Sequence, residues 1–281
     1  MPELPEVETV CRGLNQVTLN QSIRGGKVCL ERTVAYPFVL ADFLAGLTDQ
    51  SIVQWHRRGK YLLAELQRGA DAGGWLGVHL RMTGQLLWLS QTASLQSHCR
   101  VRLFFDGDHE LRFVDQRTFG RVWWVPPDQP LETIISGLAM LGPEPFSDEF
   151  SVDYLKAVLS KRQRPIKNAL LDQALIAGIG NIYADEALFL SGILPKTPCN
   201  GLSPDQIQRL HHALQQVLAA GISAGGTTFS DFRSVAGVNG NYGGEAWVYH
   251  REGQPCRVCG TAIERLKLAG RSAHYCSSCQ H

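Results

Sequence analysis

The sequence predicts an α+β protein of two domains, with an N-terminal helix packed on a β-sandwich, a helical C-terminal domain and a small four-cysteine module at the end. Three observations support this fold class. The chain opens with apolar residues at helical spacing, continues through short apolar runs divided by turn signals, and then changes to longer helical patterns. A length of 281 residues is also sufficient for two domains.

Composition excludes several classes of protein. Apolar residues make up 44% of the chain and charged residues 19%, which allows packed cores and is unlike a disordered chain. No run reaches the ~18 apolar residues of a membrane span. The acidic start lacks the apolar stretch of a secretory signal. We therefore expect a cytoplasmic protein whose cysteines are reduced.

The first predicted element is a helix over residues 5–18. Apolar side chains recur there at steps of three and four residues: Leu4, Val7, Val10, Cys11, Leu14 and Val17. From about residue 20 to 125 the pattern changes to short runs rich in Val, Leu, Phe and Trp, such as 61–66 and 121–125, with glycine turns between them. Many short strands at close spacing indicate a sandwich or a barrel on which the helix packs.

Prolines and glycines then mark a connection, and the pattern beyond it is helical. Helices are expected at 152–160, 166–177, 182–191 and 204–220, and a glycine- and asparagine-rich loop at 237–244. The predicted division is a catalytic β-sandwich domain at 1–130, a linker at 131–150, a helical domain at 151–240 and a cysteine module at 241–281.

Four cysteines near the end of the chain form two CxxC pairs. Cys256 and Cys259 precede Cys276 and Cys279, at a separation typical of zinc ribbons. Four thiolates leave no open coordination position, so the sequence predicts one structural Zn²⁺ ion in a zinc finger, with a hairpin between the pairs. Redox pairs or disulfides are the alternatives, which a reducing compartment disfavours.

Basic residues gather locally although the net charge is only +1. Residues 156–167 hold five lysines and arginines and no acid, and residues 56–60 form a second cluster. Such patches are typical of surfaces that bind a phosphate backbone. Ordinary solvated faces would look the same, so charge alone leaves nucleic-acid binding open.

The N-terminus carries a candidate nucleophile. Removal of Met1 would leave Pro2 with a free secondary amine, and an α-amino group titrates near 7.7–8.0, so a usable fraction is neutral. Such an amine condenses with an aldehyde to an iminium that drives elimination. Glu3 and Glu6 could move protons beside it. The alternative is that Pro2 and its acidic neighbours only begin a helix.

A glycine turn before a helix offers a second candidate site. In residues 176–190 the glycines at 178 and 180 would let backbone N–H groups approach a phosphate, with Asn181 at the helix start. The pattern is not the dinucleotide fingerprint, because Tyr183 stands where a third glycine is needed and a helix precedes the turn. A tight interhelical turn without ligand remains the alternative.

Taken together, these motifs resemble bacterial formamidopyrimidine-DNA glycosylases over the whole chain. The resemblance rests on residues 2–9 (PELPEVET), 59–62 (GKYL), 79–84 (HLRMTG), 115–120 (DQRTFG), 141–145 (LGPEP), 178–186 (GIGNIYADE) and the four-cysteine finger. It implies a helix-two-turn-helix domain before the finger. It also implies an enzyme that excises oxidised purines, chiefly 8-oxoguanine and formamidopyrimidines, from double-stranded DNA and then cleaves the abasic strand by β,δ-elimination.

The resemblance also implies roles for individual residues. Pro2 would attack C1′ of the damaged nucleotide, Glu3 would donate or accept a proton at the sugar, and Lys60 would take part in proton transfer and phosphate contact. Arg271, in the finger, would assist δ-elimination and grip phosphate. Further DNA contacts are implied for Met82, Arg117 and Phe119, which would fill the gap left by a flipped nucleotide, and for His98 and Asn181.

One position departs from the family pattern. The family often has a lysine four residues before Lys167, where this chain has Gln163, so either Arg162 or Arg164 is expected to supply the DNA contact in its place. The loop at 233–244 is expected to cap the flipped base. Alternatives are the sister enzyme endonuclease VIII, which takes oxidised pyrimidines, a non-catalytic zinc-finger DNA-binding protein and a protein-interaction module. A monomer without a dedicated protein partner is expected.

Overall fold

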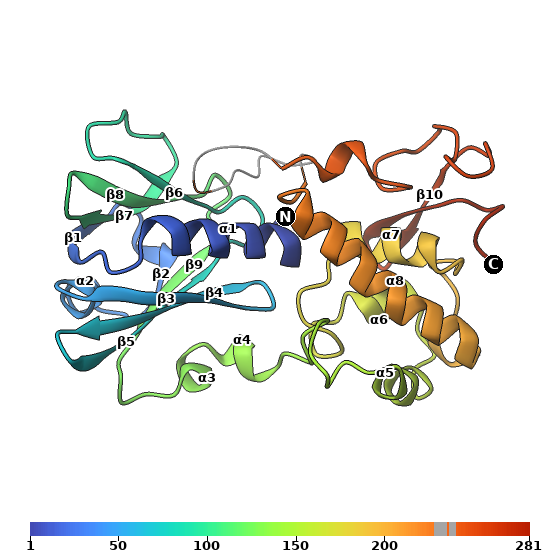
Figure 1. The fold of residues 1–281 in the computed structure, drawn as a ribbon, viewed down its shortest axis with the longest axis horizontal. Helices are drawn as coiled ribbons and strands as arrows, with labels where there is room; N and C mark the ends of the chain where they lie inside the picture. The colour runs from blue at the N-terminus through green and yellow to red at the C-terminus, as the bar shows by residue number, and fades with distance from the viewer. Residues whose placement is uncertain (228–234, 236–239) are drawn as a thin grey trace. The chain divides into compact units, whose positions relative to one another are not determined.

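The computed structural model describes residues 1–227, residue 235 and residues 240–281 (Figure 1). By contacts between residues, the chain forms two compact units. The first comprises Met1–Ala139 and Gly225–Gly240, and the second comprises Met140–Ala224 and Asn241–His281. Each unit is described by itself.

Two β-sheets form the body of the first unit. The five-stranded sheet has the order β2-β9-β5-β4-β3 and the four-stranded sheet the order β1-β7-β8-β6. Neighbouring strands are antiparallel except β2 and β9, which are parallel. The strands are β1 (Ile23–Val28), β2 (Val34–Tyr36), β3 (Ser51–Arg58), β4 (Tyr61–Arg68), β5 (Asp71–His79), β6 (Gln85–Ser90), β7 (Cys99–Phe105), β8 (His109–Val114) and β9 (Arg121–Val125).

Helix α1 (Leu4–Val17) packs on this sandwich, as the sequence predicts (Figure 1). Its side chains Val7, Val10 and Leu14 are fully buried in the same core as residues from both sheets, among them Trp55 of β3 and Phe113 of β8. Burying one such side chain contributes about 1.5–3 kcal/mol, so the apolar face of α1 anchors the start of the chain firmly.

Three helices of the first unit were not predicted. Helix α2 (Leu40–Leu47) lies among the strands and buries Phe43 and Leu47, while α3 (Leu131–Ile134) and α4 (Ser136–Ala139) occupy the predicted linker. A run of eight mostly apolar residues does not distinguish a short helix from a strand, because both would be buried. A short 3₁₀ turn, Glu31–Thr33, precedes β2.

Residues 225–240 belong to the first unit, whereas the sequence predicts them as the end of the helical domain. Three contacts among the described residues account for this. The backbone N–H of Thr227 donates to the Glu6 carboxylate at 2.9 Å, and Val235 lies in the sandwich core. The backbone N–H of Trp88 on β6 donates to the Val235 carbonyl at 3.1 Å.

The second unit contains the predicted helical region. Its helices are α5 (Val152–Leu159), α6 (Ile166–Leu170), α7 (Asn181–Leu190) and α8 (Pro204–Ser223), with 3₁₀ turns at Cys199–Gly201 and Tyr242–Gly244. Ser203 caps α8 by accepting the backbone N–H of Gln206, whose side chain accepts the N–H of Ser203 in return. This capping box and the proline after it explain why the start of α8 is visible in the sequence.

Helix α6 is shorter than the predicted helix over 166–177. It ends at Leu170, and the next residues form turns held by side chains. The Asp172 carboxylate accepts the backbone N–H of Ala174, and the Gln173 amide donates to the Ile179 carbonyl and accepts from Gly178 N–H. Local bonds of this kind compete with helical ones, which the apolar spacing alone does not reveal.

The chain ends in the predicted hairpin. Strands β10 (Glu264–Leu268) and β11 (Arg271–Tyr275) pair antiparallel, and the turn between them uses positive φ at Ala269 and Gly270. Among the described residues, no helix combines the length and apolar character needed to cross a bilayer.

Candidate active site and nucleic-acid interface

Pro2 lies buried directly before Glu3, which is the N-cap of α1. The backbone N–H of Glu3 donates to Oε2 of Glu6 at 2.8 Å, and the two carboxylates are only 2% and 1% exposed. Carboxylates are favoured here because the first N–H groups of a helix carry partial positive charge. The two predicted proton carriers therefore lie beside Pro2 in a site shielded from water.

Glu6 also holds the stem of the predicted lesion-capping loop. Its Oε1 accepts the backbone N–H of Thr227 at 2.9 Å, so one carboxylate joins the start of α1 to a residue 221 positions further along the chain. Of the loop predicted to cap the base, residues 233–244, the structure describes residue 235 and residues 240–244, and the others lie outside the described residues.

Lys60 lies in the tight turn between β3 and β4, where Gly59 has a φ of 55°. Its side chain is 7% exposed, and its charge acts on His79 at the end of β5. Burial, followed by the charges of Arg81 and Lys60, lowers the pKa of His79 to about 3. His79 is therefore neutral, and its Nδ1 accepts the backbone N–H of Arg81 at 3.0 Å.

The three predicted gap-filling residues lie on two loops of the first unit. Met82 follows β5, and Arg117 and Phe119 lie between β8 and β9. Phe119 is 49% exposed although it is large and apolar, and the Arg117 guanidinium lies 5.0 Å from the centre of its ring. An exposed aromatic with a stacked arginine is suited to bases, since both present flat faces to a ring.

His98 lies half-buried just before β7, with Nδ1 at 3.2 Å from Nη2 of Arg100. In the second unit, Asn181 is the first residue of α7 after the N-cap Gly180. Its Oδ1 is buried and has no hydrogen-bond partner in the described part of the chain. The main-chain N–H groups at the N-terminus of α7 are the groups suited to an anion, whereas Oδ1 of Asn181 is an acceptor and does not favour one.

Arg162 does not lie unpaired on the surface. Its side chain is half-buried, and Nη1 donates to the Val158 carbonyl at the end of α5, at 2.5 Å. Arg164, the other cation of this run, pairs with Asp172 at 2.6 Å. A DNA contact from Arg162 stays a prediction.

Sequence reasoning missed two buried carboxylates of α7. Asp185 is fully buried, forms an ion pair with Lys167 at 2.6 Å and accepts the backbone N–H of His274 at 2.9 Å. The Lys167 ammonium donates in turn to the Ser272 carbonyl. These contacts fix β11 on the helices and therefore fix the base of Arg271, whose side chain is exposed.

Glu186 performs a similar task one residue later. It is fully buried and accepts the backbone N–H groups of Trp247, Val248 and Tyr249 at 2.7, 3.0 and 2.9 Å. Burial raises the pKa of this carboxyl, while the three N–H groups lower it in part. A sign of this role in the sequence is an Asp-Glu pair within an otherwise apolar helix.

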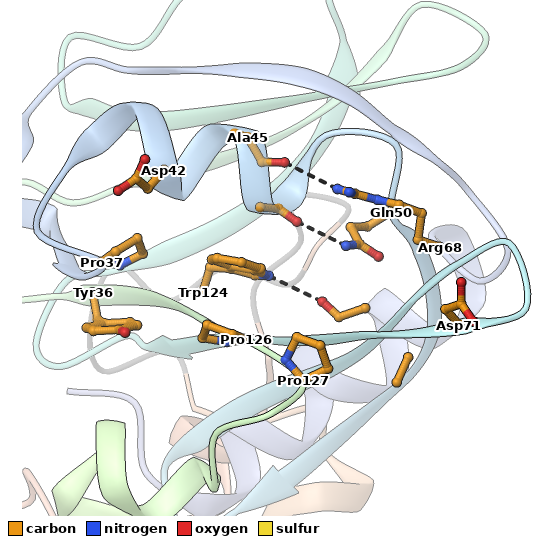
Figure 2. A pocket seen from close by; sticks show the side chains of 13 residues that line it. Tyr36, Pro37, Asp42, Ala45, Gln50, Arg68, Asp71, Trp124, Pro126 and Pro127 are labelled. Carbon is orange, nitrogen blue, oxygen red and sulfur yellow. Dashed lines mark hydrogen bonds between the residues drawn. The ribbon is translucent and has the colours of Figure 1, made fainter.

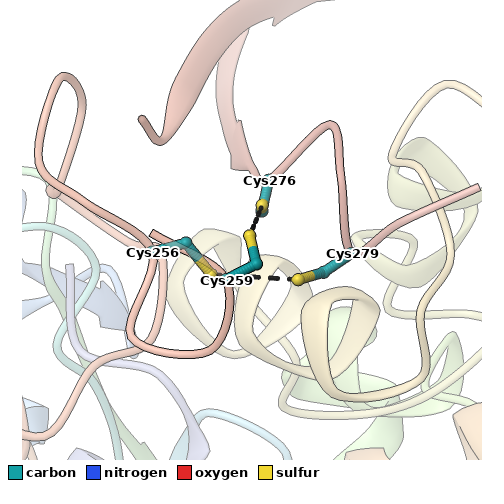
Figure 3. A group of neighbouring side chains, drawn as sticks. All are labelled: Cys256, Cys259, Cys276 and Cys279. Atoms are coloured by element: carbon teal, nitrogen blue, oxygen red, sulfur yellow. Dashed lines mark hydrogen bonds between the residues drawn. The ribbon is translucent and has the colours of Figure 1, made fainter. Parts of the chain in front are cut away.

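The four predicted zinc ligands converge at the end of the second unit (Figure 3). Their sulfur atoms all lie within 4.8 Å of one another, with Cys256 and Cys279 at 3.9 Å and Cys259 and Cys276 at 3.5 Å. Four thiolates around one Zn²⁺ at about 2.3 Å would lie roughly 3.8 Å apart, so the cluster fits this ion.

The surroundings of the cluster shift the pKa values of its thiols in opposite directions. Hydrogen bonds from Thr261 lower the pKa of the Cys259 thiol to about 6, whereas burial raises the pKa of Cys276. Four adjacent thiols resist ionising together, and a divalent cation removes that resistance.

A cavity of about 610 Å³ lies elsewhere in the first unit, between α2 and the β4–β5 hairpin (Figure 2). None of the predicted site residues lines it. Two exposed carboxylates, Asp42 and Asp71, lie at its rim, and Arg68 is turned onto the Ala45 and Thr48 carbonyls. Carboxylates and carbonyls repel phosphate, so this cavity is not suited to the DNA backbone.

Three regions of the chain each match a known family of protein domains. Residues 1–122 match the formamidopyrimidine-DNA glycosylase N-terminal domain, residues 141–233 the H2TH domain of the same enzymes, and residues 253–281 the zinc finger found in FPG and IleRS. This combination defines a class of DNA glycosylases with a sandwich domain, a helix-two-turn-helix domain and a zinc finger.

Individual relatives agree over the full length. The chain is 64% identical to the formamidopyrimidine-DNA glycosylase of Nostoc punctiforme, over all of this chain and 96% of that protein. It is 38% identical to the MutM (Fpg) protein of Thermus thermophilus, with a TM-score of 0.87 over 99% and 98% of the two chains. The Lactococcus lactis Fpg, solved with a Fapy-dG containing DNA, has 34% identity and a TM-score of 0.89 over 99% and 100%.

The chain belongs to the formamidopyrimidine-DNA glycosylase family. The resemblance drawn from the sequence is confirmed, as are the α+β fold with its sandwich, helical domain and finger, the enzyme class and the cluster for one zinc ion.

Proposed function

We propose that this protein removes oxidised purines, chiefly 8-oxoguanine and formamidopyrimidines, from duplex DNA and then cleaves the strand at the abasic site. The observation that carries the proposal is the shielded Pro2-Glu3 start of α1, in a family whose members bear the same enzymatic name. The Lactococcus lactis relative has been solved with a formamidopyrimidine lesion and with an abasic site, the substrate and the intermediate of this reaction.

Pro2 acts as the nucleophile once Met1 has been removed. Its nitrogen lone pair attacks C1′ of the lesion nucleotide, the bond from C1′ to the base breaks, and the base leaves with that electron pair and a proton. This displacement leaves an aminal at C1′. The iminium between Pro2 and C1′ forms when the deoxyribose ring opens: the nitrogen lone pair makes the second bond to C1′, the C1′–O4′ bond breaks, and O4′ takes up a proton. Because the iminium withdraws electrons, it acidifies C2′, and successive eliminations break the bonds to the 3′ and 5′ phosphates.

Glu3 transfers protons at the sugar, and the shielding of Glu3 makes it suited to this task. Water is excluded around a 2% exposed carboxylate, so its proton exchanges with the reacting sugar rather than with solvent. Lys60 contributes a buried positive charge, which neutral His79 beside it does not repel. That charge stabilises phosphate and the negative charge that develops during elimination.

The lesion must leave the stack before Pro2 can reach C1′, at a cost of a few kcal/mol. Met82 and Phe119 replace the lost stacking, and Arg117 donates hydrogen bonds to the orphaned cytosine. In the second unit, Asn181 with the N–H groups of α7 and the exposed Arg271 bind the phosphates, and His98 and Arg162 add further contacts. The structural zinc ion holds the hairpin that carries Arg271.

We further propose that the protein acts as a monomer in the cytoplasm with DNA as its partner. The residues named above all belong to one chain, and the proposed steps call on no residue of a second copy.

Borohydride trapping tests the proposed function. Processed protein, with Met1 removal verified by mass, is mixed with a duplex that carries one 8-oxoguanine opposite cytosine and is reduced. We expect a covalent adduct whose peptide map places the link on Pro2. Pro2→Gly, which retains an N-terminal amine, is expected to react more slowly, and Glu3→Gln to bind DNA without excising the base. Asp108→Asn, on an exposed turn of the same unit, is the matched control.

The outcomes separate the alternatives. An adduct only with an oxidised pyrimidine would assign the activity of endonuclease VIII. Tight binding of both duplexes without any adduct would contradict covalent catalysis and favour a DNA-binding protein.

A further inference from the structure

Asp115 is a buried carboxylate to which the reaction assigns no step. It follows β8, is 1% exposed and lies two positions before Arg117. Burying a charged side chain is unfavourable unless it is fully hydrogen-bonded, so the bonds of Asp115 identify its task.

Both oxygens of Asp115 hold loops that carry the proposed gap-filling residues. Oδ1 accepts the hydroxyl of Thr83, the residue after Met82, and Oδ2 accepts the backbone N–H of Gly120, the residue after Phe119, at 2.7 Å. The Thr83 hydroxyl also accepts the backbone N–H of Arg117 at 3.0 Å. The Asp115 carboxylate and the Thr83 hydroxyl thus join the loop of Met82 to the loop of Arg117 and Phe119, next to the residues that would enter the duplex.

The backbone of Asp115 extends the network to a third loop. Its N–H donates to the His98 carbonyl at 2.9 Å, and its carbonyl accepts Nε of Arg100 at 2.8 Å. Arg100 in turn lies 3.2 Å from the His98 ring nitrogen. The loop proposed to contact phosphate is therefore fixed to the same residue as the loops proposed to enter the stack.

The close fit around Gly120 shows that this arrangement has little freedom. A Cβ on Gly120 would lie 2.4 Å from the Phe113 ring and 3.1 Å from Oδ2 of Asp115. The loop can approach the carboxylate only because this residue is glycine.

We propose that Asp115 is a positioning residue that acts in part through the hydroxyl of Thr83. It holds the loops of Met82, Arg117 and Phe119 in fixed positions relative to one another, so that recognition of the base opposite the lesion depends on it. This inference rests on the proposed function. Three side chains can enter one gap together only if their loops keep fixed relative positions, because a misplacement of about 1 Å is costly at a reacting site. In this proposal Thr83 and Asp115 fix the loop positions through their hydrogen bonds and contact neither the sugar nor the base.

Thr83→Val is the primary test because it keeps the shape of the side chain and removes the hydroxyl. We expect the preference for cytosine over adenine opposite 8-oxoguanine, measured as the ratio of kcat/KM values, to fall about tenfold, as the loss of a hydrogen bond to a buried charge predicts. Cleavage of an abasic site in a single-stranded oligonucleotide should stay at the wild-type rate, since a single strand has no orphaned base and no gap.

Three further variants complete the test. Thr83→Ser restores the hydroxyl and should restore the preference. In Asp115→Asn, the new NH₂ group faces either the Gly120 N–H or the Thr83 hydroxyl, each of which is itself a donor, so one hydrogen bond is lost and replaced by a repulsive contact. This variant should therefore lose more of the preference than Thr83→Val. Thr92→Val changes an exposed threonine beyond β6 whose hydroxyl bonds to the Ser90 hydroxyl and which lies outside these loops, so this variant should behave as wild type.

An unchanged preference in Thr83→Val, or an equal loss on duplex and single strand, would overturn the inference. The second outcome would indicate a general loss of stability. Either result is distinct from failure of the proposed function, in which the wild-type protein itself would act on no oxidised-purine duplex.

Discussion

Replacing Lys167 by methionine tests whether buried charge holds the finger on the helical unit. Lys167 is 1% exposed and its partner Asp185 is fully buried, with 2.6 Å between Nζ and Oδ1. Methionine has a similar volume but no charge, so Lys167→Met leaves the carboxylate of Asp185 buried without its cation. His274 remains beside it, with Nδ1 at 3.2 Å from Oδ2.

The expected cost follows from that geometry. Breaking a buried ion pair by removing one partner destabilises proteins by about 3–5 kcal/mol, a large part of the roughly 5–15 kcal/mol that keeps a domain folded. We expect this loss in urea unfolding of the zinc-loaded protein, followed by tryptophan fluorescence. Zinc release into a colorimetric chelator should quicken in parallel, because β11 loses its anchor at Ser272 as well.

Two comparisons decide whether the reasoning holds. Lys156→Met changes an exposed lysine on α5 of the same unit and should cost little. Adding Asp185→Asn to Lys167→Met removes the unpaired charge but keeps an acceptor for the His274 N–H, so it should recover part of the loss. A cost below about 1 kcal/mol for Lys167→Met, or no recovery in the double variant, would refute the argument.

Three more predictions follow from other contacts. Gly120→Ala should destabilise the first unit by about 1–3 kcal/mol, because its Cβ would lie 2.4 Å from the Phe113 ring; calorimetry measures this. Cys279→Ser should release zinc, as read by metal analysis, and weaken DNA binding in a gel-shift assay, and full affinity without metal would contradict a structural role. His79 is neutral when folded, because its pKa is lowered from 6.5 to about 3, so its contribution is fully present above pH 6.5 and is lost as the pH falls from 6.5 toward 3. Stability should therefore fall over that window by up to about 1.4 kcal/mol per pH unit from this group, and His79→Gln should flatten that slope in urea titrations at several pH values.

Features that depend on nearby residues could be predicted from the sequence. Helix α1 and the finger are examples, because apolar spacing and cysteine spacing determine them directly. The end of α6 could not be predicted, since it depends on how the side chains of Asp172 and Gln173 bond to the main chain. Helix α2 was missed because a short apolar run fits a strand equally well.

The candidate site divides in the same way. Pro2 could be proposed from the chemistry of an N-terminal secondary amine, and the resemblance indicated both Pro2 and Arg117 because they belong to recognisable motifs; the roles of both remain predictions. The carboxylates of Asp115 and Glu186 were not identified, because acidic residues are expected at the surface and only the folded chain surrounds these two with donors.

Helix α7 limits how this protein can be divided by recombination. Asn181 begins the helix, and the carboxylates that hold residues 247–249 and 274 lie within its first two turns. A chimera of two relatives joined at residue 240 would take its finger from one parent and α7, with the buried carboxylates that hold that finger, from the other. Exchanges between relatives that begin before residue 166 and run to the end of the chain would transfer Lys167, α7 and the hairpin together, and only those should give a finger that folds onto its own helix.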